Sequence, residues 1–134
     1  MRKILITIGL FAFISCAKHS EEIDIVKSDL VKRNHSKDDI EQMQFQTFEV
    51  TGKDVYKYNS NRLQKDYKSV ESLGNYELSA RILKRIDSVL KNYKEIESKK
   101  FVKVIAYKTA PDTISKSIYF IDDAKNINSF HLVK

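Results

Sequence analysis

The amino-acid sequence predicts an α+β fold, in which an antiparallel pair of helices packs on a three-stranded antiparallel β-meander. Two observations predict it. From residue 36 to residue 96, apolar side chains recur mainly at spacings of three and four, as in helices with one buried face. From Phe101 on, the spacing falls to two, and β-branched and aromatic residues become frequent, as in strands. Residues 36–134 are therefore predicted to form a single domain.

The first helix is predicted to begin at Ser36. The residues Ser36-Lys37-Asp38-Asp39 resemble a capping box, with Asp in place of the usual Glu or Gln. Ile40, Met43 and Thr47 then follow at spacings of three and four, with Phe48 beside them, as in a helix with one buried face. Residues 45–58 are compatible with two structures, a helix broken near Gly52 or a β-hairpin that turns at residues 51–54, and we favour the helix.

The helix pair is predicted from the residues on either side of Gly74. Before it, Tyr56, Leu63, Tyr67 and Val70 lie at spacings of seven, four and three, and glycine often ends a helix by adopting positive φ. After it, Asn75 is a suitable N-cap for a helix with a continuous apolar arc. The arc consists of Leu78, Ile82, Leu83, Ile86, Val89, Leu90, Tyr93 and Ile96. The short junction predicts that the two helices run antiparallel.

Three strands are predicted after the helices, at residues 101–109, 114–122 and 127–133. The links between them carry turn residues such as Pro111 and Asp112, and they are too short for parallel crossovers. Residues 118–121 are apolar on both sides of the predicted middle strand, so both faces of the sheet should be covered. The candidates for this cover are the first helix, residues 23–30, a second copy of the chain or a ligand. We favour cover by the chain itself.

The N-terminal residues have the layout of an export signal. Arg2 and Lys3 give a positive start, residues 4–14 are apolar, and the run ends at Cys16, the only cysteine. A membrane-spanning helix needs about 20 apolar residues, which makes the run too short for one. A plain secretory signal more often ends in a small-x-small pattern, which Phe13 does not match.

The ending Phe13-Ile14-Ser15-Cys16 resembles a bacterial lipobox, with Phe13 in place of the usual leucine. The resemblance covers the first sixteen residues only. It implies that residues 1–15 are a lipoprotein signal peptide, that the Cys16 sulfur carries diacylglycerol, and that the new amino terminus carries an acyl group such as palmitate. It also implies a place in the cell envelope, on the outer membrane, either periplasmic or surface-exposed.

Cleavage before Cys16 leaves 119 of the 134 residues, and the lipidated thiol is then not free to form a disulfide. Loss of Arg2 and Lys3 leaves 22 basic against 18 acidic side chains, a small surplus. Residues 16–35 are mixed and polar, and we interpret them as the lipidated cysteine and a polar tether. Ile23, Ile25 and Val26 are the exception, because they could form a short strand or a segment that docks on the domain.

The sequence contains no arrangement typical of a catalytic, cofactor or metal site. The three histidines have no metal-ligand spacing, the paired acids lie where helix caps and turns are predicted, and no serine has a readable histidine–acid partner. Acidic residues interrupt each basic and aromatic cluster, which argues against a nucleic-acid partner. The residues considered were His19, His35, His131, Asp38, Asp39, Asp122, Asp123, Ser115, Ser117 and Ser129.

These observations together predict a lipid-anchored, non-catalytic protein of the cell envelope that binds another envelope or extracellular protein. The predicted partners are thus the membrane, through the anchor at Cys16, and that protein. The alternative is a carrier of a small apolar ligand, held in a pocket between helices and sheet. An enzyme is the least supported class. The sequence makes no prediction about the oligomeric state.

Overall fold

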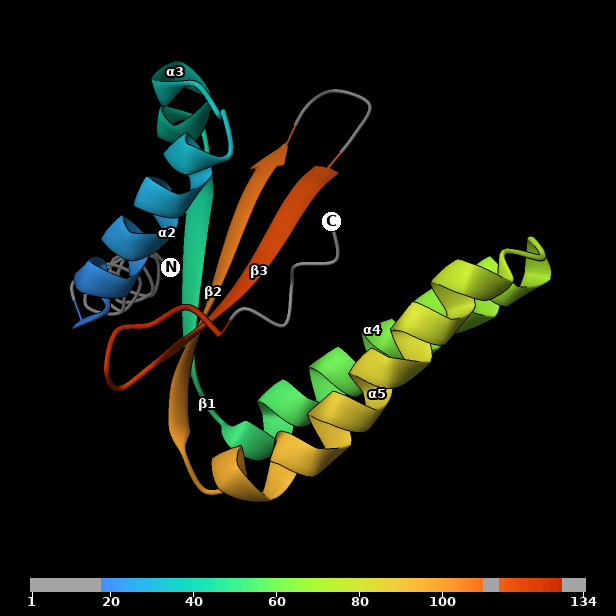
Figure 1. Ribbon diagram of the computed structural model, residues 1–134. Coiled ribbons are helices and arrows are strands. Elements are labelled where there is room, and N and C mark those ends of the chain that lie inside the picture. The colour runs from blue at the N-terminus through green and yellow to red at the C-terminus, as the bar shows by residue number, and fades with distance from the viewer. Residues whose placement is uncertain (1–17, 110–113, 129–134) are drawn as a thin grey trace, which may run out of the picture. The chain divides into compact units, whose positions relative to one another are not determined.

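A computed structural model describes residues 18–109 and 114–128 of the chain (Figure 1). The predicted signal peptide and Cys16 lie outside the described residues. The described part divides into two compact units, residues 18–49 with 102–109 and 114–128, and residues 50–101. Within it, no helix is both long enough and apolar enough to cross a membrane.

The first unit is built around a three-stranded antiparallel sheet in the order β1-β2-β3 (Figure 1). The strands are β1 (Gln44–Thr51), β2 (Lys100–Thr109) and β3 (Ile114–Asp122). Two helices precede them, α2 (Ser20–Lys32) and α3 (Lys37–Glu41). The second unit contains α4 (Gly52–Ser72) and α5 (Tyr76–Ile96), which form the antiparallel helix pair. The predicted α+β class is therefore confirmed.

The sheet contains one strand that the sequence interpretation assigned to helix. Residues 44–51 form β1, and only from Gly52 is the chain helical, so neither the helix nor the hairpin predicted for residues 45–58 is correct. The half-buried positions of β1 begin with Phe45 and Thr47, a period of two. The helix predicted to begin at Ser36 is the short α3, and Ser36 is its N-cap, because the Ser36 Oγ accepts a hydrogen bond from the Asp39 N–H at 3.1 Å.

The central strand is β2, so β3 is not the middle strand that we predicted. The strand predicted at residues 127–133 is described only at its start. There Ile127 forms an isolated antiparallel bridge with Ile121, and the Asn128 N–H donates to the Phe120 carbonyl at 2.8 Å. Residues 129–133 lie outside the described residues.

Helix α2 replaces most of the predicted tether. Ile23, Val26 and Leu30 lie on one side of it at spacings of three and four, and their side chains are 9%, 0% and 1% exposed. They pack against alternate residues of two strands, which point to one face of the sheet. Those residues are Val104, Ala106, Tyr119 and Ile121. The segment that could dock on the domain thus does so, and it covers one face of the sheet.

The helix pair has an apolar core of its own. Leu63 of α4 and Ile82 and Val89 of α5 are buried together, and half-buried side chains of both helices pack around them. The predicted junction is confirmed, since Gly74 has φ 71° and the Asn75 side chain accepts a hydrogen bond from the Leu78 N–H at 3.1 Å.

The base of the helix pair closes on a glycine. The Gly52 N–H donates a hydrogen bond to the Lys99 carbonyl at 2.9 Å, and Gly52 is buried. A Cβ atom at this position would lie 1.5 Å from the carbonyl oxygen of Ile96. Only glycine therefore permits the first turn of α4 to approach the last turn of α5 this closely.

Candidate functional site

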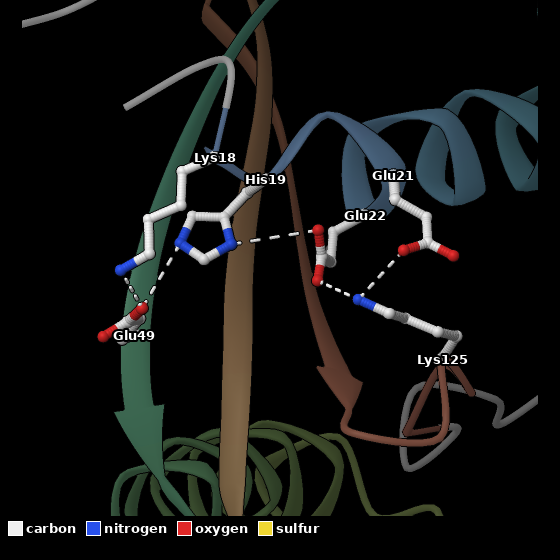
Figure 2. Close-up of polar contacts among 6 residues, drawn as sticks. All are labelled: Lys18, His19, Glu21, Glu22, Glu49 and Lys125. Atoms are coloured by element: carbon white, nitrogen blue, oxygen red, sulfur yellow. Dashed lines mark hydrogen bonds and ion pairs between the residues drawn. The ribbon is translucent and has the colours of Figure 1, made fainter. Parts of the chain in front are cut away.

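A network of polar contacts among ionisable side chains surrounds the start of α2 (Figure 2). His19 lies between two carboxylates, with its Nδ1 3.8 Å from Glu22 and its Nε2 3.7 Å from Glu49 of β1. Lys18 pairs with the same Glu49 at 2.6 Å. Lys125, from the turn after β3, donates to Glu22 at 2.5 Å. The network therefore connects α2, β1 and the turn after β3 within the first unit.

Glu22 is the most buried carboxylate of this network, with a side chain 7% exposed, and it pairs with Lys125. Burial of Glu22 opposes its ionisation, but hydrogen bonds from Lys125 and the backbone outweigh burial, so the pKa of Glu22 lies below 4.5. The hydrogen bond to Glu22 in turn raises the pKa of Lys125. Both shifts favour the charged forms. This is the behaviour of a structural ion pair, whereas general acid–base catalysis uses groups whose pKa lies near the working pH.

We expect Glu22→Gln to lower the free energy of unfolding by about 1 kcal/mol at neutral pH, because the charge-assisted bond to Lys125 is lost. The pKa of Glu22 is lowered in the folded state, so its contribution is present above pH 4.5 and is lost as the pH falls through the folded-state pKa. The difference between parent and variant should therefore vanish in acid. Urea unfolding across this pH range measures it.

Glu21→Gln is the matched control for this prediction. Glu21 contacts the same Lys125 at 3.3 Å, but its side chain is 67% exposed, so its removal should change the free energy of unfolding by less than about 0.5 kcal/mol. Equal effects of the two variants, or a Glu22→Gln effect that persists in acid, would contradict the assignment of Glu22 as the buried partner.

A second polar cluster fixes α2 on the sheet. Asp29 accepts a hydrogen bond from the Arg33 Nε at 2.6 Å and another from the Tyr119 hydroxyl of β3. Burial, together with the charge and hydrogen bond of Asp29, raises the pKa of Tyr119 to about 12. Tyr119 is 5% exposed, so its hydroxyl is a buried polar group satisfied by Asp29, whereas the Arg33 side chain at the edge of the cluster is 40% exposed.

Two of the acidic residues singled out in the sequence, Asp39 and Asp122, have structural roles. Asp39 accepts a hydrogen bond from Ser36 and pairs with Lys108 of β2 at 2.8 Å. Asp122 accepts a hydrogen bond from the Asn126 N–H at 2.8 Å within the turn after β3. His19 belongs to the network above, His35 is exposed after α2, and His131 lies outside the described residues. In residues 18–109 and 114–128, no group of three or more potential ligands is arranged to hold a metal ion.

The helix pair exposes four large apolar side chains, which we call the hairpin surface. Leu73 and Tyr76 flank the Gly74 turn and are 81% and 80% exposed. Leu83 and Leu90 of α5 are 45% and 51% exposed, and together with Tyr76 they are spaced by seven residues. A spacing of seven places side chains on one stripe of a helix. The apolar arc of α5 is thus wider than the part that α4 covers.

A pocket of about 520 Å³ lies between α2, α3 and the start of β1, and we call it the α2–α3 pocket. Ile40 of α3 and Phe45 of β1 contribute apolar side chains to its wall, and Lys27 and Lys37 contribute basic ones. The lining residues are Lys27, Ser28, Val31, Lys37, Ile40, Glu41, Met43 and Phe45. The volume lies in the range of sites for small molecules.

Comparison of the chain with protein-family models, curated proteins and solved structures found no match.

Sequence reasoning missed the α2–α3 pocket, because it assigned Lys27 and Val31 to a tether and Phe45 to a helix. The available signal was the helical spacing of the apolar residues 23, 26 and 30. Within the helix pair, Ile86 packs against the apolar core, and the rings of Tyr93 and Tyr56 lie 4.3 Å apart between centroids at an angle of 39°.

Proposed function

We propose that the mature chain is a lipid-anchored, non-catalytic protein of the bacterial cell envelope that binds another protein through the hairpin surface. The anchor is supported by the signal-like residues 1–15 and by Cys16. The binding role is supported by one observation above the others, the exposure of Leu73 and Tyr76 at the end of the helix pair. Tyrosine and leucine at such a place bury a large area when a partner covers them.

The end of the helix pair is also held in a defined shape. Gly74 adopts the left-handed conformation, the Asn75 side chain caps α5, and the Ser79 hydroxyl donates to the Asn75 carbonyl at 2.9 Å. The backbone of this capped turn is already ordered, so it loses little conformational freedom when a partner binds, which favours affinity. Ion pairs within the helices, such as Arg81 with Glu77 at 2.6 Å, give the surrounding surface a charged rim.

Because α2 takes the place of most of the predicted tether, the lipid anchor that we propose lies close to the folded first unit. The helix begins at Ser20, four residues after Cys16, and its residues enter the core at Glu22 and Ile23. A lipid on Cys16 would therefore hold the first unit near the bilayer, without a long spacer. The outer membrane, with either a periplasmic or a surface-exposed position, is the location that we propose.

The experiment uses full-length protein in cells, labelled with a tagged fatty acid and carrying a photo-crosslinking residue at position 76. We expect the parent chain to take up the label and to crosslink to a distinct envelope protein. Cys16→Ser should remove the label and the membrane retention, because the acylated atom is the Cys16 sulfur. Mass spectrometry identifies the crosslinked partner.

Placement of the same photo-crosslinker at Lys84, an exposed position of α5 outside the hairpin surface, is the control. A photo-crosslinker at position 83 should also capture the partner. We expect the double variant Leu73→Ser and Tyr76→Ser to abolish this capture without changing the temperature of thermal unfolding. Label uptake by Cys16→Ser would overturn the anchor. Equal crosslinking from positions 76 and 84 would overturn the binding surface.

The second candidate function, a carrier of a small apolar ligand, is favoured by a different observation. The α2–α3 pocket has the volume of a ligand site, and Val31, Ile40, Met43 and Phe45 supply apolar contacts. Its residues are separate from those of the hairpin surface, so the two functions can be tested independently.

A further inference from the structure

We infer that the α2–α3 pocket is a binding site for a long-chain amphiphile with an anionic headgroup, whose chain lies on the apolar wall and whose head meets Lys27 and Lys37. This inference names the ligand class of the carrier function. It does not depend on the protein-binding proposal, because the hairpin surface contributes no residue to the pocket.

The apolar wall is fixed by the core of the first unit. Ile40 is 7% exposed and belongs to the core cluster, while Met43 and Phe45 are half-buried and pack against it. Val31 of α2 also lines the pocket and is 50% exposed. Water thus contacts an apolar surface that the fold holds in place, and an alkyl chain that displaced this water would gain about 25 cal/mol for each Å² of apolar area covered.

The charge of the pocket selects the headgroup. Lys27 and Lys37 outnumber Glu41, the one acidic residue in the lining, and the Ser28 hydroxyl adds a further donor. The Lys27 ammonium lies 5.4 Å from the centroid of the Phe45 ring, so positive charge is held over the apolar wall. Among the described residues, neither lysine forms an ion pair, in contrast to Lys108 and Lys125 of the same unit.

These two properties define the ligand together. An uncharged apolar molecule would leave both ammonium groups without an anionic partner, and a cationic amphiphile would be repelled by them. A small hydrophilic anion would leave Val31, Met43 and Phe45 exposed to water. A carboxylate or similar anion attached to a long alkyl chain would contact both the apolar wall and the two lysines. The ligand is a free fatty acid in its carboxylate form.

The test is photo-crosslinking of the full chain. The chain is irradiated with a long-chain carboxylate that carries a diazirine on its alkyl part, or with the ammonium-headed analogue, and adducts are located by mass spectrometry. We expect the carboxylate probe to label peptides that contain Val31 or Met43. Lys27→Glu combined with Lys37→Glu should lower this labelling about tenfold, since two favourable charge contacts become repulsive. The same variant should gain labelling by the ammonium probe.

Lys65→Glu combined with Lys68→Glu makes the same change of charge on exposed positions of α4, and it should leave the labelling of Val31 and Met43 peptides unchanged. Thermal unfolding checks that both double variants are folded. Equal labelling by the two probes would overturn the inference, as would adducts confined to residues outside the pocket. Crosslinks between two protein chains at Val31 or Met43 would overturn it in favour of a second copy as the occupant.

Discussion

Gly52→Ala will destabilise the helix pair by about 3 kcal/mol or more, the largest effect that we expect from a single methyl group in this chain. The added Cβ would lie 1.5 Å from the carbonyl oxygen of Ile96 and 2.3 Å from its carbonyl carbon. These are backbone atoms in the last turn of α5, so no side-chain rotation can relieve the overlap. The base of the pair must open, with loss of the hydrogen bond from the Gly52 N–H to the Lys99 carbonyl.

Urea unfolding, followed by helical circular dichroism, measures this effect. Gly74→Ala is the control, because a Cβ at Gly74 meets no atom within 4 Å and only the φ of 71° opposes it. The left-handed conformation should cost about 1–2 kcal/mol for alanine. A Gly52→Ala variant that unfolds at the same denaturant concentration as the parent would show that α4 and α5 do not approach each other so closely.

Leu30→Ala should lower the free energy of unfolding by about 2–5 kcal/mol, because Leu30 is 1% exposed in the core of the first unit. The loss combines the transfer free energy of the removed methyl groups with the cavity left beside Val104 and Tyr119 of the same core cluster. Denaturant unfolding of the full chain gives the value. The result distinguishes a docked helix from a polar tether, since a tether residue would contribute nothing to the core.

Val31→Ala is the matched control, one residue further along α2. Its side chain is 50% exposed, so the variant should remain within about 0.5 kcal/mol of the parent. Equal small effects at the two positions would mean that α2 is not docked, and would restore the interpretation of residues 16–35 as a tether. A large effect at both positions would place Val31 in the core and close the α2–α3 pocket.

The elements that the sequence predicted correctly are those whose structure is decided by nearby residues. The α5 helix has its N-cap at Asn75 and a periodic apolar arc within one segment, and Ser36 caps α3 through a residue three positions away. β2 and β3 are rich in β-branched and aromatic residues, and only a few residues separate them in the sequence. In each case, propensity, capping and periodicity agree over a short stretch of chain.

The elements that were missed depend on partners far away in the sequence. β1 pairs with β2, and the hydrogen bond from Gln46 to Tyr107 joins residues 61 positions apart, so a weak local pattern was overridden by strand pairing. α2 contains many charged residues, and its apolar residues become a core face only when the sheet lies against them. The α2–α3 pocket requires both elements, and no local pattern could have shown it.

The sequence by itself determined the composition of the α5 arc, the turn at Gly74, the two C-terminal strands of the sheet and the lipobox-like ending at Cys16, because each is encoded in consecutive or helically spaced residues. The tertiary structure alone decided that residues 20–32 belong to the core, that residues 44–51 complete the sheet, and that Lys27 is held over Phe45. The physical reason is that burial and strand pairing are set by which distant surfaces meet, and this is not a property of any one segment.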